Sequence, residues 1–262
     1  MINFNLISAV GVCLLFFSRV EARIFGGHVT WRPVAASSTQ VYLDVTTFYE
    51  GTTCTPGNLL EVPLWSCSTS CTTPSSRPSQ LGTTCGITDT EDNWSINHFQ
   101  DTYTVSATGQ FSLTLTENVG FFPQTKRTFL SSFDNGIRSD TGRPNYSPVV
   151  TQDPIIRIKS GCATTIKIPV TDNDGDNLFC RYATGAVECG DFCTGTTSAI
   201  ALVGNTCTIT YDGTAGASDI NVALMIEDRP TSTLTVGSRS VTTSDTITAV
   251  PLQFTIKSQY VV

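Results

Sequence analysis

Hydrophobic and polar residues alternate one by one in many separate stretches of this 262-residue chain. A period of two is typical of β-strands, and no window of eleven or more residues shows the 3.6-residue period of an amphipathic helix. Gly, Pro, Asn and Asp occupy the intervals between the stretches, as turns require. The pattern predicts an all-β protein whose strands each have one face toward a core and one toward water. The clearest sets are Val41/Leu43/Val45, Tyr103/Val105/Ala107, Phe111/Leu113/Leu115, Ile166/Ile168/Val170, Cys207/Ile209/Tyr211, Ile220/Val222/Leu224/Ile226 and Val250/Leu252/Phe254/Ile256.

Two local connections follow from the same pattern. The sets at 103–107 and 111–115 flank Thr108-Gly109, which predicts a β-hairpin. Asn135-Gly136 favours a tight turn.

A polar stretch with three prolines, Ser139–Pro154, is unsuited to a central strand and marks a boundary. We therefore expect two β-sandwich domains, at 23–147 and 148–262. Between Cys54 and Asp92 the first is rich in Ser, Thr and Pro, which predicts a long loop.

The second domain has the strand count of an immunoglobulin-like or cadherin-like sandwich, about seven. Because each strand has one apolar face, we expect two sheets packed face to face. The predicted strands begin near Ile155, Thr165, Leu178, Ala199, Thr206, Asp219 and Ala249.

The N-terminus predicts a signal peptide at residues 1–22. Ile7–Phe17 is an apolar run too short to span a bilayer, and Val20-Glu21-Ala22 offers small residues before a cut. Secretion follows, with no membrane anchor expected in the rest of the chain.

Charged residues make up only 14% of the chain, and the formal net charge is −7. Ser and Thr carry the polar load instead, as suits an extracellular surface. The acidic balance and the lack of Lys/Arg runs exclude nucleic acid and anionic membranes as expected partners.

Nine of the ten cysteines remain after Cys13 leaves with the signal peptide. In a secreted chain we expect disulfide bonds, although the spacings of Cys67/Cys71 and Cys189/Cys193 could hold zinc in the cytosol. An odd number leaves one cysteine free or paired with another chain, so a disulfide-linked dimer is possible. The nine are Cys54, Cys67, Cys71, Cys85, Cys162, Cys180, Cys189, Cys193 and Cys207.

Asp172, Asp174 and Asp176 alternate on one turn, where Gly175 permits a sharp backbone. Oxygen ligands on one turn suit calcium. The turn is not an EF-hand, because Asn177 and Ala183 stand where that loop needs Gly and Glu. In a cadherin-like site, Glu227 and Asp228 at the end of another strand would add ligands. The alternative is a solvated turn without metal.

Two sequons predict N-glycosylation at Asn93 and Asn145, the second followed by Pro148. Trp31 with Arg32 and His28 forms either an exposed recognition site or, as we favour, a core Trp with Arg across it. Neither His28 nor His98 lies in a catalytic motif, so we expect no enzyme.

Several motifs resemble a group of mostly uncharacterised secreted proteins of invertebrate animals, often followed by EGF-like repeats. The chain departs from that group by lacking cysteines around Gly120–Leu130 and by having no downstream EGF-like repeats. The resemblance implies extracellular placement and a binding or matrix role. The motifs are Gly26–Pro33 (GGHVTWRP), Arg138–Gly142 (RSDTG), Asn145–Pro148 (NYSP), Pro154–Asp176 and Pro251–Phe254 (PLQF), with the late cysteine pattern.

We therefore expect a secreted, non-enzymatic extracellular protein that contacts an extracellular protein or glycan. It would be a structural or adhesive component of a matrix, for example a calcified or cuticular one. The first alternative is a soluble recognition protein that binds a glycan or a receptor through loops at one end of a sandwich. An enzyme would need a concave pocket with a carboxylate pair or a histidine of perturbed pKa.

Overall fold

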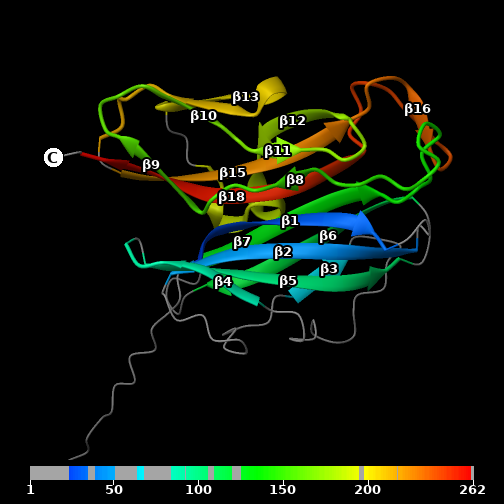
Figure 1. Cartoon of the computed structure of the whole chain (residues 1–262), viewed down its shortest axis with the longest axis horizontal. Coiled ribbons are helices and arrows are strands. Elements are labelled where there is room, and N and C mark those ends of the chain that lie inside the picture. The colour runs from blue at the N-terminus through cyan, green and yellow to red at the C-terminus, as the bar shows by residue number, and fades with distance from the viewer. Residues whose placement is uncertain are drawn as a thin grey trace, which may run out of the picture.

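The computed structural model describes residues 24–34, 39–50, 64–67, 84–91, 93–105, 109–119, 125–194, 198–216 and 218–260. These residues form β-strands with little helix, which confirms the predicted all-β class (Figure 1). Helical turns in the described ranges are α1 (Gly185–Glu188), η2 (Gly190–Phe192) and η3 (Gly204–Thr206). None of them is long and apolar enough to span a membrane.

The second half of the chain forms a sandwich with the strand order of an immunoglobulin-like domain. Its larger sheet is β9 (Ile155–Lys159), β18 (Thr248–Gln259), β15 (Ser218–Arg229) and β12 (Asn177–Tyr182), with β9 parallel to β18. The facing sheet is β10 (Thr164–Lys167), β14 (Thr208–Tyr211) and β13 (Ile200–Val203). The short strands β8 (Val149–Val150) and β11 (Val170–Thr171) pair beside it. All seven predicted strands are confirmed within two residues of their predicted starts.

The first half also places two groups of strands around a core. One group is β1 (Ile24–Pro33), β2 (Gln40–Glu50), β5 (Trp94–Thr104) and β4 (Thr84–Asp89). Behind it in Figure 1 lie β7 (Thr125–Asp134), β6 (Gln110–Val119) and β3 (Leu64–Cys67). Trp31 of β1 and Phe133 of β7 meet between them, with ring centroids 4.7 Å apart.

The predicted hairpin at 103–115 is wrong. β5 pairs with β2 and β4, whereas β6 pairs with β3 and β7. A hairpin would place both apolar faces on the same side of one sheet. The chain instead crosses from β5 to β6 in the opposite group of strands, so Tyr103 and Leu113 are buried in one shared core.

Strand β18 joins the two halves. One of its edges pairs with β15 along nearly its whole length. The other edge pairs in turn with β7 at Ala249, with β1 at Leu252 and Gln253, and with β9 from Thr255 onward. One hydrophobic cluster includes core residues of both halves. The predicted domains 23–147 and 148–262 therefore share a sheet and a core, although Ser139–Pro154 contains only the two-residue strand β8.

The expectation of one solvated face per strand is wrong for β15 and β18. Val222 and Leu224 face the main core, while Ala223 and Met225 on the other side of β15 are also fully buried. The helical segment 185–193, closed by the Cys189–Cys193 disulfide, contributes Cys189 and Phe192 to the cluster that covers this second side.

The disulfide prediction is confirmed for the cysteines whose bonds are described. Cys180–Cys207 joins the two sheets of the second sandwich, across 27 residues of sequence, and a loop of that length corresponds to about 3–4 kcal/mol of stabilisation. Cys67 is also disulfide-bonded, and Cys162 is free and exposed. Cys54, Cys71 and the side chain of Cys85 lie outside the described residues.

A substitution at Gly27 can test how closely β1 packs against its neighbours. A Cβ at Gly27 would lie 2.4 Å from the carbonyl oxygen of Thr46, so we expect Gly27→Ala to force β1 away and destabilise the protein by about 1–3 kcal/mol. Thermal unfolding measures the loss. Gly216→Ala is the control, because a Cβ there would lie 3.6 Å from the Tyr260 hydroxyl, which is an ordinary contact. Equal melting temperatures for the two variants would contradict the packing described.

Candidate functional site

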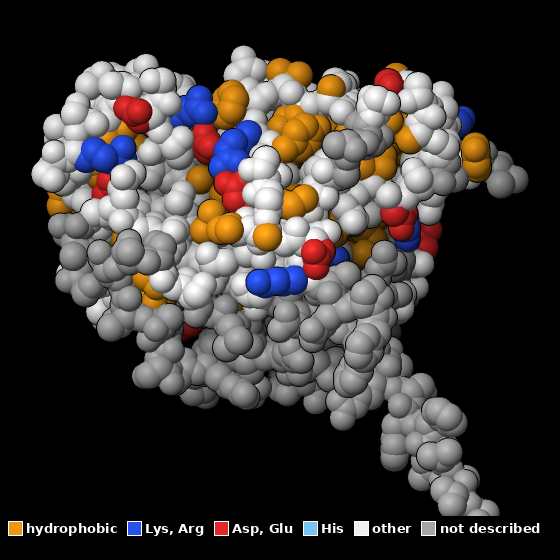
Figure 2. All heavy atoms as spheres, turned by 180° about the vertical axis from the view of Figure 1, so that it is seen from behind, with side chains coloured by type: hydrophobic (Ala, Val, Ile, Leu, Met, Phe, Trp, Pro, Cys, Tyr) orange, Lys and Arg blue, Asp and Glu red, His pale blue; other side chains and the backbone are white. Residues whose placement is uncertain are grey.

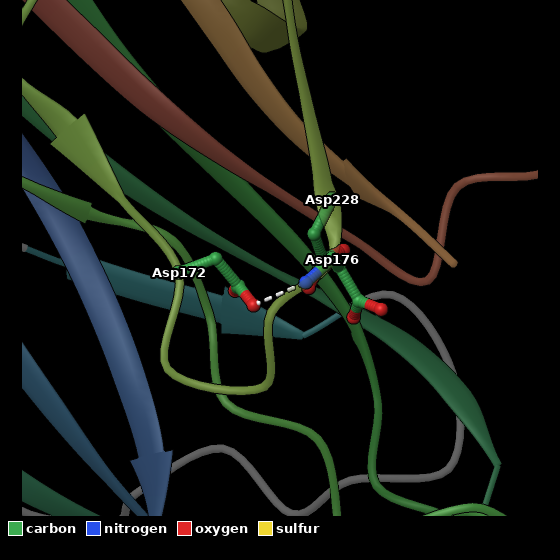
Figure 3. A group of neighbouring side chains, drawn as sticks. All are labelled: Asp172, Asp176 and Asp228. Carbon is green, nitrogen blue, oxygen red and sulfur yellow. Dashed lines mark hydrogen bonds between the residues drawn. The ribbon is translucent and has the colours of Figure 1, made fainter. Parts of the chain in front are cut away.

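The aspartate turn closes on itself through Asp172. Its carboxylate accepts the backbone N–H group of Asp176 at 2.9 Å (Figure 3). It also accepts the backbone N–H group of Asp174 at 2.9 Å. The predicted sharp backbone at Gly175 is confirmed, because its φ of +79° is left-handed. The turn connects β11 to β12 and is therefore held at both ends by strands.

Arg138 lies at the centre of this region, with a side chain only 1% exposed. Its Nε and Nη2 donate to Asp140 at 3.0 and 2.8 Å. Its Nη2 also donates to Asp176 at 2.9 Å, and its Nη1 donates to Asp176 and to Asn145. All five guanidinium N–H groups are thus engaged. Burial alone would lower the pKa of Arg138, but the bonds to Asp176 and Asp140 raise it, so the charge is retained.

Asn145 connects Arg138 to the end of β15. Its amide nitrogen donates to Asp228 at 2.6 Å and to Thr248 at 3.2 Å. Asp228 also accepts the backbone N–H of Thr248 at 2.5 Å. Burial raises the pKa of Asp228 well above its ordinary value; the charges of Asp172 and Asp176 add to this, and the bond from Asn145 opposes it.

The five predicted calcium ligands do not converge. Asp172, Asp176 and Asp228 have oxygens within 4.8 Å of one another. Asp174 instead accepts the N–H of Tyr146 at 2.6 Å and pairs with Arg143. Glu227 is the neighbour of Asp228 on a strand and points to the opposite face, so it belongs to a separate ion-pair group, at 2.7 Å from both Arg181 and Arg229.

In this group of three carboxylates, Oδ2 of Asp172 has no hydrogen-bond partner among the described residues, but the other oxygens leave calcium short of ligands. The ion needs six to eight oxygen ligands, whereas both oxygens of Asp176 already bind the Arg138 guanidinium. Both oxygens of Asp228 accept hydrogen bonds. A divalent cation there would also meet the buried positive charge of Arg138. The protein supplies a cation of its own to the aspartate turn.

The two predicted glycosylation sites differ in access. Asn93 is exposed in a left-handed turn before β5, so its modification stays a prediction. Asn145 is fully buried, and its amide nitrogen is the donor to Asp228. A glycan on that nitrogen is incompatible with this fold, so the expectation at Asn145 is wrong.

Arg138 and its partners Asp140, Asp176 and Asn145 are called the arginine centre below. A groove lies beside it, between the outer face of β1, β2 and β5 and the segment that leads into β8. It encloses a cavity of about 330 Å³. Residues on both sides of the predicted domain boundary form it. The lining residues are His28, Thr30, Trp31, Arg32, Asp44, Thr46, His98, Tyr146, Ser147, Val149, Val150 and Asn173.

Cross-strand rows build the floor of the groove. His28, Thr46 and His98 are direct neighbours on β1, β2 and β5 and share the outer face. The hydroxyl of Thr46 lies 3.2 Å from Nδ1 of His98. In the next row Asp44 accepts a hydrogen bond from Gln100 at 2.6 Å.

The wall of the groove is held by the arginine centre. The N–H of Tyr146 donates to Asp174, and Ser147 pairs with the backbone of Trp31 through both its N–H and its hydroxyl. Asn173 lies within the aspartate turn itself.

His28 is the most perturbed group in the groove. Burial, and then the nearby His98, lower its pKa to about 4. Its Nδ1 is buried and has no hydrogen-bond partner among the described residues. Because its pKa is lowered, the imidazole is neutral near pH 7.

The prediction that Trp31 is a core residue is confirmed, because it is 1% exposed. The arginine beside it was placed wrongly: Arg32 points to the other face and stacks on Tyr42, 4.3 Å from the ring centroid. Strand alternation separates the two side chains.

Sequence reasoning missed Arg138 as a site residue and assigned Asn145 only a glycan. Both lie in motifs that carry the resemblance, where they read as parts of a linker. Asp176, which binds Arg138, lies 38 residues along the chain, and Asp228, which binds Asn145, lies 83 residues along. A local pattern holds no signal for such contacts.

No protein-family model and no curated protein matches this sequence. Among solved structures, the titin Ig tandem domains A164-A165 are matched over 92% of this chain and 98% of that chain, at 7% sequence identity and a TM-score of 0.26. Neither fold nor function is inferred from a match of this kind.

Replacing Arg138 should strongly destabilise the folded protein. Arg138→Met leaves the carboxylates of Asp140 and Asp176 without their cation, and we expect a loss of about 3–5 kcal/mol in the free energy of unfolding. Chemical denaturation measures it. Arg143→Met is the matched control: that side chain is half-exposed beside Asp174, and its loss should cost under about 1 kcal/mol. Similar losses in the two variants, or a large rise in stability with millimolar calcium, would contradict this account.

The lowered pKa of His28 predicts an acid-sensitive contribution to stability. Because the unfolded histidine binds a proton more readily, stability is complete above about pH 6.5 and falls as pH drops toward the folded pKa of about 4. His28→Gln should remove up to roughly 3 kcal/mol of this pH dependence. The measurement is the difference in unfolding free energy between wild type and variant at neutral pH and at about pH 4.5. A difference that does not change with pH would refute the prediction.

Proposed function

We propose that this chain is a secreted, non-enzymatic extracellular protein that works by binding, as a structural or adhesive component of a matrix, calcified or cuticular. The observation that carries the proposal is the polar groove, with walls fixed by the arginine centre. Both halves of the chain contribute to it, so the groove forms only where the two halves are folded together. Preorganised side chains of this kind favour recognition.

The bonded cysteines support extracellular placement. Cys180–Cys207 and Cys189–Cys193 persist in oxidising compartments and are rare in the cytosol. The predicted signal peptide agrees with this and lies outside the described residues.

The chemistry of the groove supports binding over catalysis. A histidine with a pKa of about 4 is a weak base at neutral pH. Among the described residues, no carboxylate hydrogen-bonds to His28 or His98, so neither is oriented as in a catalytic triad.

The rest of the described surface offers little else for an apolar partner. Figure 2 shows basic and acidic side chains next to one another and hydrophobic side chains in small groups. The large hydrophobic residues exposed in the described ranges are Ile137, Val187, Val203 and Tyr260, which are far apart in the sequence. Single exposed residues are normal and mark no interface.

The second candidate is a soluble recognition protein for a glycan or a receptor. Tyr146, flanked by Asn173 and the aspartate turn, is the feature that favours it. The two candidates differ in whether the protein stays in an insoluble matrix.

Secretion and matrix association are tested together by expressing the full chain in secreting animal cells. We expect a product cleaved after Ala22, outside the cells and enriched in the detergent-insoluble matrix. A product found only in the medium would favour the soluble recognition protein, and an unprocessed intracellular product would overturn both.

Asn93→Gln should lower the mass by one N-glycan, and Cys162→Ser should abolish any disulfide-linked dimer seen without reduction.

A further inference from the structure

We infer that the groove binds an uncharged saccharide, roughly one or two sugar rings in size. This inference rests on the proposed function, since it names the ligand of the same groove. The residues that would contact the sugar are His28, Thr46, Tyr146 and Asn173, with Asp44 as a further acceptor.

The size of the cavity fits a small ligand. About 330 Å³ lies at the lower end of the range for small-molecule sites. Its floor is a row of cross-strand side chains, and its wall is formed by residues between Tyr146 and Val150. A flat ring laid on the floor would touch both.

The hydrogen-bonding groups match those of sugar hydroxyls. A hydroxyl both donates and accepts, and so do Thr, Asn, Ser and a neutral imidazole. His28 lines the groove and its imidazole is neutral near pH 7, so it can exchange a hydrogen bond with a ligand hydroxyl. Each such bond is lost if the ligand lacks the hydroxyl, which gives selectivity.

The charges in the groove are already balanced. Asp44 lies 3.5 Å from Arg32 and accepts from Gln100, while His28 is neutral near pH 7. At the wall, Arg143 pairs with the buried Asp174. A phosphate, sulfate or carboxylate ligand would find no free counter-charge here, so an uncharged ligand is favoured.

Strand pairing argues against an extended peptide. A peptide that adds to a sheet needs a free strand edge. β1 is paired with β2 on one edge, and on the other with β18 near Gly27 and with Ser147 at Trp31. β8 is paired with β11. The groove thus presents side chains rather than unpaired backbone.

Tyr146 provides an apolar surface for the ring. Its side chain is half-buried in the wall, with the Arg143 guanidinium 5.4 Å from the ring centroid. The face of an aromatic ring carries partial negative charge and attracts the polarised C–H groups of a sugar.

The experiment is an array of uncharged, sialylated and sulfated glycans probed with the secreted full chain, followed by titration of the best uncharged saccharide. Thr46→Val keeps the shape and removes one hydroxyl, and Asn173→Ala removes an amide on the wall. We expect each to weaken binding about three- to tenfold without a change in melting temperature. Thr102→Val is the matched control, an exposed threonine on β5 that does not line the groove.

Binding of uncharged glycans that both groove variants weaken, and the control does not, would establish the site. Binding confined to acidic glycans, affinity unchanged by Thr46→Val and Asn173→Ala, or no uncharged glycan bound at all would each overturn the inference. In the last case, retention in the insoluble matrix would show that the proposed function stands without this ligand.

Discussion

The pairing of β18 on both of its edges is the constraint on which the rest of the structure depends. Along one edge it follows β15, and along the other it meets β7, β1 and β9 in succession. Pro251, which has no N–H to donate, lies between the pairing with β7 at Ala249 and the pairing with β1 at Leu252. A strand shared in this way leaves no free edge and is buried on both faces, so both halves require it.

The arginine centre provides hydrogen-bond partners for the segment that connects the two halves. The segment from Asn135 to Pro148 must pass between the halves, and it carries buried polar groups that need partners. Arg138 and Asn145 provide them by binding Asp176, in the turn before β12, and Asp228, in β15. A buried ion pair contributes little net stability, but losing one partner is costly. The centre therefore fixes the path of the segment more than it adds to the free energy of folding.

Sequence reasoning reached the features that depend on local periodicity. A few neighbouring residues are enough to indicate these features. They are the strand starts near 155, 165 and 219, the buried Trp31 and the sharp turn at Gly175. Sequence reasoning failed where contacts between distant segments determine the structure. Alternation at 103–115 is the same for a hairpin as for a crossing between sheets, and the sequence of β18 does not show that other strands cover both of its faces. The cation for the aspartate turn comes from Arg138, 38 residues before Asp176, where calcium was the local interpretation.

The same reasoning explains why the groove belongs to neither half alone. His28 and Thr46 on its floor come from the first half, whereas Asn173 comes from the aspartate turn of the second. Their relative position is set by β1, which pairs with β18 at Gly27 and with Ser147 at Trp31. A division of the chain at residue 148 separates the floor from part of the wall, so each isolated half would lack a site that the whole chain has. A ligand in the groove would contact both halves and would therefore stabilise the contact between them.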